Sequence, residues 1–129
     1  MTAQVHAIAP ATVLRGAGAW QQALPLIAAR SQRPLLLGRS ASTQALRQRL
    51  QADLEATGLR VQTSSLQHDC CDEELMPLGQ QAATEGVDAV IAAGGGKVLD
   101  AGKLLADRLG LPCITVPTSA ATCAGWTAL

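Results

Sequence analysis

Apolar and polar residues alternate along the chain in blocks that have the lengths of strands and helices. Short runs that are almost wholly apolar, such as Asp88–Ala93 and Cys113–Val116, indicate strands that are buried on both faces. In longer segments an apolar residue returns every three or four positions, as Leu46, Leu50 and Leu54 do, and this period predicts amphipathic helices. The two patterns follow one another along most of the sequence.

The positions of the elements follow from these patterns. The predicted strands are Thr12–Leu14, Leu35–Leu37, Arg60–Ser64, Asp88–Ala93 and Cys113–Val116. The predicted helices are Ala19–Arg30, Thr43–Thr57, Glu73–Glu85 and Val98–Leu109, with a last helix beginning near Ala120. Ser42 or Thr43 is expected to cap the second helix, and Gly58 stands where a left-handed residue would end it. Pro25 lies inside the first helix and is expected to start or bend it there.

Strands that alternate with helices predict an α/β fold, a doubly wound parallel sheet with right-handed crossovers and helices on both faces. Ligands of such sheets bind beyond the carboxyl ends of the strands. The informative turns are therefore those after Leu37, Ala93 and Val116. Because 129 residues suffice for one domain with a core and not for two, residues 1–129 are interpreted as a single domain.

The composition argues against several classes of function. Hydrophobic residues make up 48% of the chain and charged residues 16%, which is a globular composition. The formal net charge is zero, so no electrostatic field favours nucleic acid or an acidic membrane. Phe and Tyr are absent, which argues against a stacking platform for single-stranded bases.

The start of the chain and the cysteines bear on where the protein works. Residues 1–10 have neither the basic nor the apolar region of a signal peptide, and no apolar run approaches the ~20 residues of a membrane span. The four cysteines show no C-x-x-C spacing, and Cys70 and Cys71 are adjacent, so reduced thiols are the simplest interpretation. We expect a cytoplasmic protein that binds neither membrane nor nucleic acid, and the sequence leaves a homo-oligomer open.

The turn Gly94–Lys97 has the pattern of an anion-binding site. Three glycines follow a predicted strand and lead directly into a helix, so backbone N–H groups can approach a phosphate without interference from a Cβ. Lys97 adds a full positive charge, and Asp100 and Lys103 follow on the same helix at a spacing that places them on one face. The alternative is a tight turn with a solvated ion pair behind it.

Two familiar phosphate-binding motifs do not fit this turn. A dinucleotide fingerprint requires a third small residue where this sequence has Leu99, and an acidic partner for the ribose roughly 20 residues later. A P-loop requires Ser or Thr after its lysine, where this sequence has Val98.

The surrounding residues carry a more specific resemblance. The segment Gly94–Ala106 (GGGKVLDAGKLLA) resembles the Gly-Gly-Gly-x-x-x-Asp-x-x-Lys signature of iron-containing alcohol dehydrogenases. Ile114–Leu129 (ITVPTSAATCAGWTAL) is similar to the strand-Pro-Thr segment of the same family, and the opening strand with Gly16 and Gly18 has the family's layout. The glycerol dehydrogenase branch is the part of the family that the chain resembles most.

The resemblance implies a Rossmann-like first domain that binds NAD or NADP. In the family a helical second domain holds a divalent metal, zinc or iron, and a small alcohol or polyol binds between the two. The cofactor-binding residues that the resemblance implies are Arg39, Gly94, Gly95, Gly96, Lys97, Asp100, Thr118, Ser119, Thr127 and Leu129. Among them Gly95, Gly96 and Lys97 match positions that hold the pyrophosphate, and Thr127 and Leu129 match positions on the nicotinamide side. Thr118 and Ser119 also suit helix capping.

The chain departs from the family pattern at two positions. Arg39 stands where glycerol dehydrogenases usually have the Asp that binds the adenosine ribose. Thr122 and Cys123 stand where the family has a Thr-Asp pair beside the substrate, and a thiol is a poor replacement for a carboxylate as hydrogen-bond acceptor. Glycerol itself is therefore in doubt as the substrate.

The metal ligands of the family, one Asp and two His, have no counterpart in this sequence. His6 and His68 are the two histidines of the chain, and neither lies in a matching context. We expect the chain to be the first domain of a longer parent, without catalytic or metal-binding residues of its own and inactive alone.

Three alternatives stay open. Dehydroquinate synthases share the fold and the triple glycine but generally carry Gly at the position of Lys103. The sn-glycerol-1-phosphate dehydrogenases resemble Gly94–Lys103 about as well, but their His-Asp pair after the Pro-Thr turn is missing. A non-catalytic nucleotide-binding module is the third alternative, and Cys123 favours it.

Overall fold

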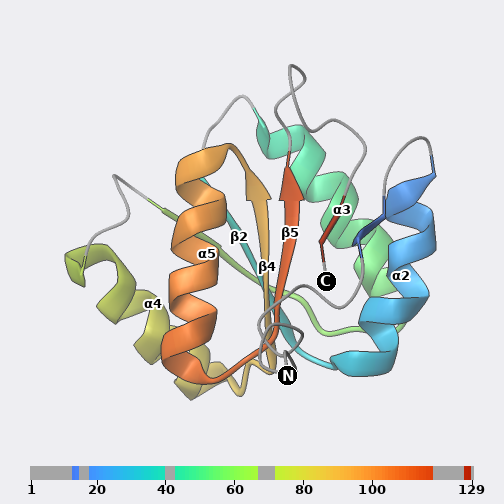
Figure 1. The fold of residues 1–129 in the computed structure, drawn as a ribbon. Helices are drawn as coiled ribbons and strands as arrows, with labels where there is room; N and C mark the ends of the chain where they lie inside the picture. Colours follow the sequence, from blue (N-terminus) through green and yellow to red (C-terminus); the bar gives the residue numbers. More distant parts are fainter. Residues whose placement is uncertain (1–12, 15–17, 40–42, 67–71, 118–126, 129) are drawn as a thin grey trace, which may run out of the picture.

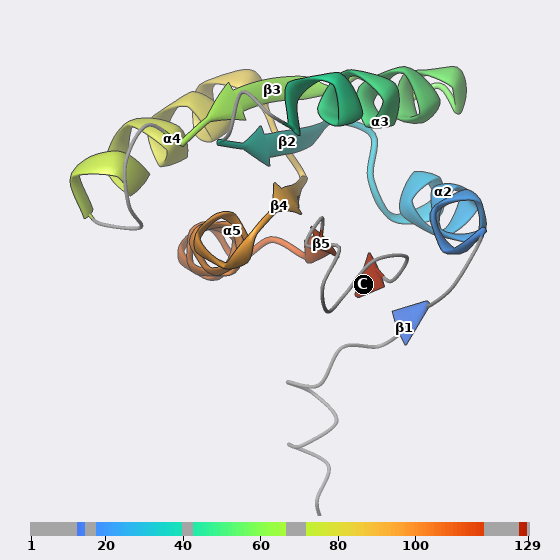
Figure 2. The ribbon, with the colours of Figure 1, turned by 90° about the horizontal axis from the view of Figure 1, so that it is seen from above.

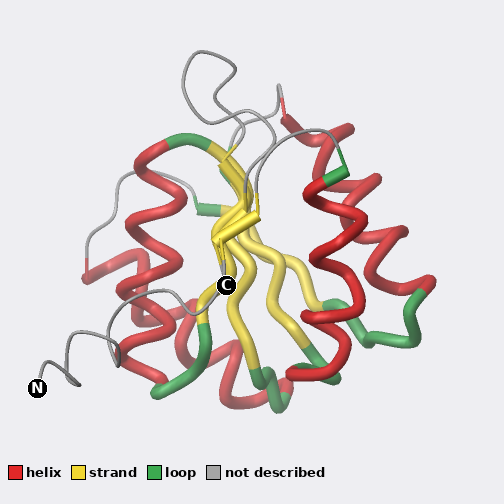
Figure 3. Tube along the Cα trace, turned by 45° about the vertical axis from the view of Figure 1, so that its right-hand side comes forward, coloured by secondary structure: helices red, strands yellow, loops and turns green. Residues whose placement is uncertain are grey.

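The computed structural model describes residues 13–14, 18–39, 43–66, 72–117 and 127–128. Six strands form one sheet in the order β1-β6-β5-β4-β2-β3 (Figures 1 and 3). Their bounds are β1 Val13–Leu14, β2 Pro34–Gly38, β3 Gln62–Ser65, β4 Ala89–Gly94, β5 Cys113–Pro117 and β6 Thr127–Ala128. Strands β3, β2, β4 and β5 are parallel neighbours, whereas β6 runs antiparallel to both β5 and β1.

Helices cover both faces of the sheet, so the predicted doubly wound α/β fold is confirmed. Their bounds are α2 Ala19–Arg30, α3 Gln44–Ala56, α4 Asp72–Glu85 and α5 Gly96–Leu109. Seen from above, α2 and α3 lie on one face and α4 and α5 on the other (Figure 2). None of the helices in the described ranges is long and apolar enough to cross a bilayer.

The central strands are buried because nearly every side chain in them is apolar. All residues of β2 and β4 are buried, and alternate residues face opposite layers. Leu36 and Ile91 pack with α2 and α3, whereas Leu35 and Val90 pack with α4 and α5. A strand that is apolar on both faces can be covered by helices on both sides, which is the arrangement the sequence predicts.

Glycines follow three of the described helices, as the sequence predicts for Gly58. Gly58, Gly86 and Gly110 have φ values of +97°, +68° and +68°, in the left-handed region that residues with a Cβ rarely adopt. Pro25, in contrast, neither starts nor interrupts α2, which runs through it as one helix. Its side chain is exposed, while Ala23 and Ile27 on either side are buried and hold the helix against the sheet.

Two further local predictions were wrong. Residues Thr127–Ala128 form strand β6 and not the end of a helix, because the backbone there pairs with Thr115 of β5 and with β1. The proposed start of that helix near Ala120 lies outside the described residues. Thr43 occupies the N-cap position of α3, as predicted, but its side chain makes no capping hydrogen bond.

Strand β3 is a short polar edge. Its four residues read Gln-Thr-Ser-Ser, and it pairs with β2 alone in the strand order of the sheet. The side-chain amide of Gln81 on α4 donates to the backbone oxygen of Thr63 at 3.3 Å. A side chain of α4 therefore provides a hydrogen-bond donor to one backbone carbonyl of this edge strand.

Candidate functional site

A pocket opens at the carboxyl ends of β2 and β4, where the sequence predicts ligand binding. Its volume is about 230 Å³. The lining residues come from the segment after β2 and from the turn between β4 and α5, and they are Arg39, Thr43, Gly94, Gly95, Gly96, Lys97 and Val98. The two segments are far apart in sequence and meet because β2 and β4 are adjacent parallel strands. Five of the predicted cofactor residues thus line one pocket.

The glycine turn leaves its backbone open to the pocket. Gly94 ends β4 with φ +154°, and a Cβ placed on it would lie 3.2 Å from the Cβ of Val98. Gly95 precedes α5 with φ −84°, and a Cβ on Gly95 or on Gly96 would meet no atom within 4 Å. These two glycines border empty space, so a ligand can reach the backbone there and a side chain would fill that space.

Helix α5 makes this end of the pocket electropositive. Its first internal hydrogen bond joins the N–H of Leu99 to the oxygen of Gly95 at 3.1 Å. The N–H groups of Gly96 and Val98 therefore have no carbonyl partner inside the helix, and the helix dipole adds a partial positive charge. Neither Asp nor Glu occurs among the described residues that line the pocket. The arrangement suits an anion such as a phosphate.

Of the other predicted cofactor and substrate residues, Asp100 alone is described with its side chain, and it does not line this pocket. Asp100 is exposed on α5, beyond the turn. Thr127 belongs to β6, of which the backbone alone is described. The remaining predicted positions lie outside the described residues, and they are Thr118, Ser119, Thr122, Cys123 and Leu129.

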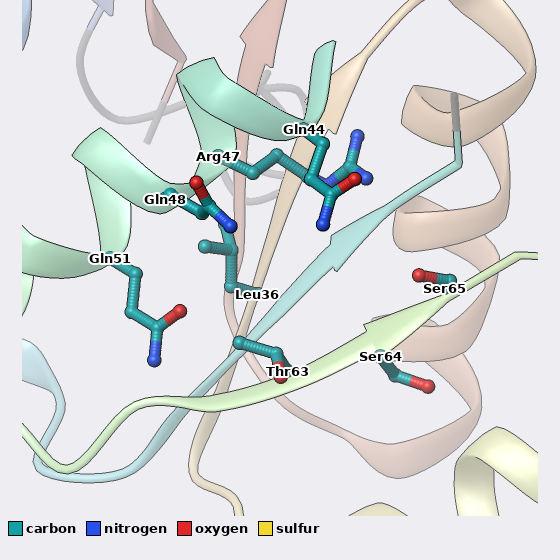
Figure 4. A pocket seen from close by; sticks show the side chains of 8 residues that line it. All are labelled: Leu36, Gln44, Arg47, Gln48, Gln51, Thr63, Ser64 and Ser65. Carbon is teal, nitrogen blue, oxygen red and sulfur yellow. The ribbon is translucent and has the colours of Figure 1, made fainter. Parts of the chain in front are cut away.

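A second pocket of about 310 Å³ lies between α3 and β3, next to the first. Figure 4 shows Arg47, Gln48 and Gln51 reaching into it from α3, opposite residues of β3. The lining residues are polar apart from one leucine, and they are Leu36, Gln44, Arg47, Gln48, Gln51, Thr63, Ser64 and Ser65. A third hollow, lined by Gln32, Arg33, Gly58 and Arg60, opens at the opposite ends of the strands.

The sequence analysis missed Thr43 and Arg47 as site residues. Arg47 Nη1 donates to Thr43 Oγ1 at 2.6 Å, which links a residue of the second pocket to a residue of the first. The four-residue spacing of Thr43 and Arg47 at the start of a helix is a signal that could have indicated this pair, because such residues are neighbours on a helix surface.

Two titratable groups elsewhere in the fold have shifted pKa values. Burial raises the pKa of the Cys113 thiol to about 11, although the nearby charge of Lys103 acts in the opposite direction. For Asp88 burial also acts to raise the pKa, but hydrogen bonds from Ser31 and from backbone N–H groups, among them Gln32 and Arg33, outweigh it and lower the pKa below 3.8. In the described ranges no three His, Cys, Asp or Glu side chains lie close enough to hold a metal ion.

Comparison with known proteins finds one family over almost the whole chain. The sequence model of the iron-containing alcohol dehydrogenases matches residues 10–129. An uncharacterized oxidoreductase of Synechocystis sp. is 40% identical over 123 residues, which are 95% of this chain and 31% of that protein. Hydroxycarboxylate dehydrogenase A of Escherichia coli is 58% identical over 53 residues, which are 39% of this chain and 15% of that protein.

Solved structures agree with the sequence comparison. The crystal structure of a probable glycerol dehydrogenase from Sinorhizobium meliloti superposes with a TM-score of 0.69 and 25% identity, covering 88% of this chain and 30% of that one. The chain thus spans less than a third of the length of each of these three proteins. By the family match and by its fold, the chain belongs to the iron-containing alcohol dehydrogenase family.

Proposed function

We infer that this chain is the N-terminal nicotinamide-dinucleotide-binding domain of a metal-dependent alcohol or polyol dehydrogenase of the glycerol dehydrogenase type. One observation carries the proposal. Arg39 and the turn Gly94–Lys97 line a single pocket, which has no Asp or Glu among its described lining residues and borders the open backbone of Gly95 and Gly96. In this arrangement the turn binds the diphosphate of NAD or NADP, and Arg39 lies near the adenosine ribose.

The chemistry of the pocket fits the diphosphate of a nicotinamide dinucleotide. The start of α5 and Lys97 supply donors and positive charge to the diphosphate. When bound, the nicotinamide ring of the cofactor accepts a hydride from the alcohol. The role of the described lining residues is to hold and orient the dinucleotide, and no His, Asp or Glu that could act as a general base is among them.

Isothermal titration calorimetry of the 129-residue chain with NADH and with NADPH tests this proposal. The key variant is Gly95→Val, because a Cβ at Gly95 has no described atom within 4 Å and its branches would project into the pocket. We expect the affinity of both dinucleotides to fall at least about tenfold through lost phosphate hydrogen bonds. Gly95→Ala fills less of the space and is expected to give a smaller loss.

A matched control separates loss of the site from loss of the fold. Ala83→Val introduces the same branched side chain at an exposed position near the end of α4, which leads to the start of β4, whereas the glycine turn follows the end of β4. This control should bind both dinucleotides as the wild-type chain does, and circular dichroism should show helix in all variants. Equal dinucleotide affinity in folded Gly95→Val and wild type would remove the diphosphate from this turn.

We assign the metal of the proposed reaction to a second domain, as the family resemblance implies. A divalent metal would act there as a Lewis acid that polarises the alcohol. The chain alone is then expected to bind dinucleotide without oxidising alcohols. Polyol-dependent formation of NADH or NADPH by the purified chain, with zinc or iron(II) added, would contradict this assignment.

A further inference from the structure

Arg47 lies against Gly38, the last residue of β2. A Cβ built on Gly38 would overlap the end of the Arg47 side chain, with its Cζ only 2.6 Å away. The absence of a side chain at Gly38 is therefore what allows Arg47 to cross the end of β2. Arg39, which lines the proposed cofactor pocket, is the next residue in the chain. The guanidinium is thus placed beside the segment that borders this pocket.

Thr43 connects Arg47 to the same pocket. Its hydroxyl oxygen accepts a hydrogen bond of 2.6 Å from Arg47 Nη1, and this side chain is not used to cap α3. Since a hydroxyl has a single hydrogen, one that accepts from a guanidinium directs its own O–H away from it. Arg47 therefore fixes the orientation of a pocket-lining hydroxyl, and Thr43 lies in the wall between the guanidinium and the pocket.

The charged side chains described as lining the two neighbouring pockets are all positive. They are Arg39, Arg47 and Lys97, and no Asp or Glu is among the described lining residues. Lys97 lies at the glycine turn, whereas the two arginines gather at the end of β2. A ligand that spans the pocket therefore meets positive charge at two separate places. A dinucleotide with a single diphosphate needs one such place, and a dinucleotide with an additional phosphate on its ribose needs both.

We propose that Arg47, acting through Thr43, is a positioning residue that makes this site selective for nucleotides with a 2′-phosphate on the adenosine ribose. The proposal rests on the function inferred above and goes beyond it in naming the ligand class and the second arginine. Arg39 and Thr43 contact the 2′-phosphate. Arg47 holds the Thr43 hydroxyl in place, and its positive charge attracts the phosphate without direct contact.

The experiment measures binding of two fragments that differ only in the 2′-phosphate, adenosine 2′,5′-bisphosphate and adenosine 5′-monophosphate, to the 129-residue chain. We expect the wild-type chain to bind the bisphosphate more tightly. Arg47→Gln should lower the affinity for the bisphosphate roughly tenfold, which is the effect of losing one charge-assisted hydrogen bond. The affinity for the monophosphate should stay within about twofold of wild type. Arg47→Lys should recover part of the loss, because it restores the charge without the fork of donors.

Two further variants disturb the contact between Arg47 and Thr43 without changing Arg47 itself. Thr43→Val removes the hydroxyl at nearly constant shape, and Gly38→Ala displaces the Arg47 side chain without changing any charge. Both should lower the selectivity for the bisphosphate, and they keep the proposal testable if Arg47→Gln does not fold. The matched control is Arg49→Gln, an exposed arginine of the same helix that lines neither pocket, and it should change neither affinity.

The pH dependence gives a readout that a purely structural role of Arg47 would not change. A phosphate monoester takes its second negative charge near pH 6. The ratio of the two dissociation constants should therefore shift in favour of the bisphosphate between pH 5.5 and pH 7.5 in the wild type, over about the range of that ionisation. In Arg47→Gln this shift should be clearly smaller.

The outcomes separate the inference from the proposed function. If the wild type binds neither fragment nor NADH nor NADPH, the proposed function fails and the inference fails with it. If the wild type binds the monophosphate and NADH but gains nothing from the 2′-phosphate, the function stands and the inference is overturned. Selectivity that survives in folded Arg47→Gln and Thr43→Val also overturns the inference.

Discussion

Gly102 of α5 lies so close to Ala92 of β4 that a Cβ on Gly102 would be 2.5 Å from the Cβ of Ala92. Real Cβ atoms do not approach so closely, so any larger residue at this position moves the helix from the sheet. Because α5 begins at the glycine turn, this contact also sets the position of the helix start in the pocket.

Gly102→Ala is therefore expected to destabilise the chain. The overlap with Ala92 should cost about 1–3 kcal/mol, of which the better helix propensity of Ala returns up to about 1 kcal/mol. Gly79→Ala on α4 is the control, because its Cβ would make an ordinary contact of 3.8 Å with Leu105 and should stabilise the chain slightly. Urea unfolding measures the free energy of unfolding of both variants and of the double variant Gly102→Ala/Ala92→Gly. A Gly102→Ala variant as stable as wild type would contradict the close contact.

The carboxylate of Asp88 joins the end of α2 to the start of β4. It accepts hydrogen bonds from Ser31 Oγ at 2.5 Å and from the N–H groups of Gln32 and Arg33 at 2.8 and 3.1 Å. Since the folded pKa of Asp88 is below 3.8, its stabilisation is present above that value and is lost as the pH falls through the folded pKa.

Asp88→Asn should accordingly lower the free energy of unfolding at pH 7 by about 1 kcal/mol, allowing for solvent screening at this partly exposed site. The difference from wild type should shrink as the pH drops below 3.8, since the native carboxyl is then protonated as well. Denaturant titrations at pH 7 and at acid pH measure it, with exposed Asp107→Asn as control. A difference that does not depend on pH would mean that the charge of Asp88 is not involved.

The thiol of Cys113 is expected to react slowly. Burial raises its pKa to about 11, so at pH 8 almost all of it is protonated, and the thiolate is the reactive form. Iodoacetamide labelling with peptide mapping should show slow modification at pH 8 that accelerates up to about pH 11, and rapid modification in denaturant. Labelling of native Cys113 at pH 8 at the rate of an unstructured cysteine peptide would show that the thiol is neither protected nor shifted.

Arg39→Asp should reverse the preference between the two dinucleotides. An acidic residue at the end of the second strand of such a sheet pairs with a ribose 2′-hydroxyl, whereas an arginine accommodates a 2′-phosphate. We expect the variant to lose NADPH affinity at least about tenfold more than NADH affinity. Calorimetry measures the dissociation constants of NADPH and NADH, and their ratio is compared with that of wild type. A ratio within about twofold of wild type would show that Arg39 does not recognise the 2′ position.

The fold could be predicted where the local pattern and the tertiary environment agree. Strand β4 is apolar at every position, and such a run suits a strand that is covered by helical layers on both faces. Gly58 and Gly110 mark helix ends because their left-handed conformations are set locally. The sequence also indicated the turns after Leu37 and Ala93 as places for a ligand, and the structure brings the two together in one pocket because β2 and β4 are adjacent.

The errors concern contacts between residues that are far apart or that have competing partners. The pairing of Ala128 with Thr115 gives β6 its strand conformation, and nothing in the local sequence indicates it. The Thr43 hydroxyl could cap its helix or bind a neighbouring side chain, and the arginine one turn later takes it. The overlap of Arg47 with the position of a Cβ at Gly38 is a property of packing alone.

The polar edge strand β3 bears on how chains of this protein behave when they are crowded together. An exposed sheet edge is a template on which a strand of another molecule can assemble. This edge is four residues long, carries amide and hydroxyl side chains, and has the Thr63 carbonyl already engaged by Gln81. An incoming strand would gain few hydrogen bonds and almost no apolar contact, so the leucine-rich interior of the sheet is shielded from aggregation at this side.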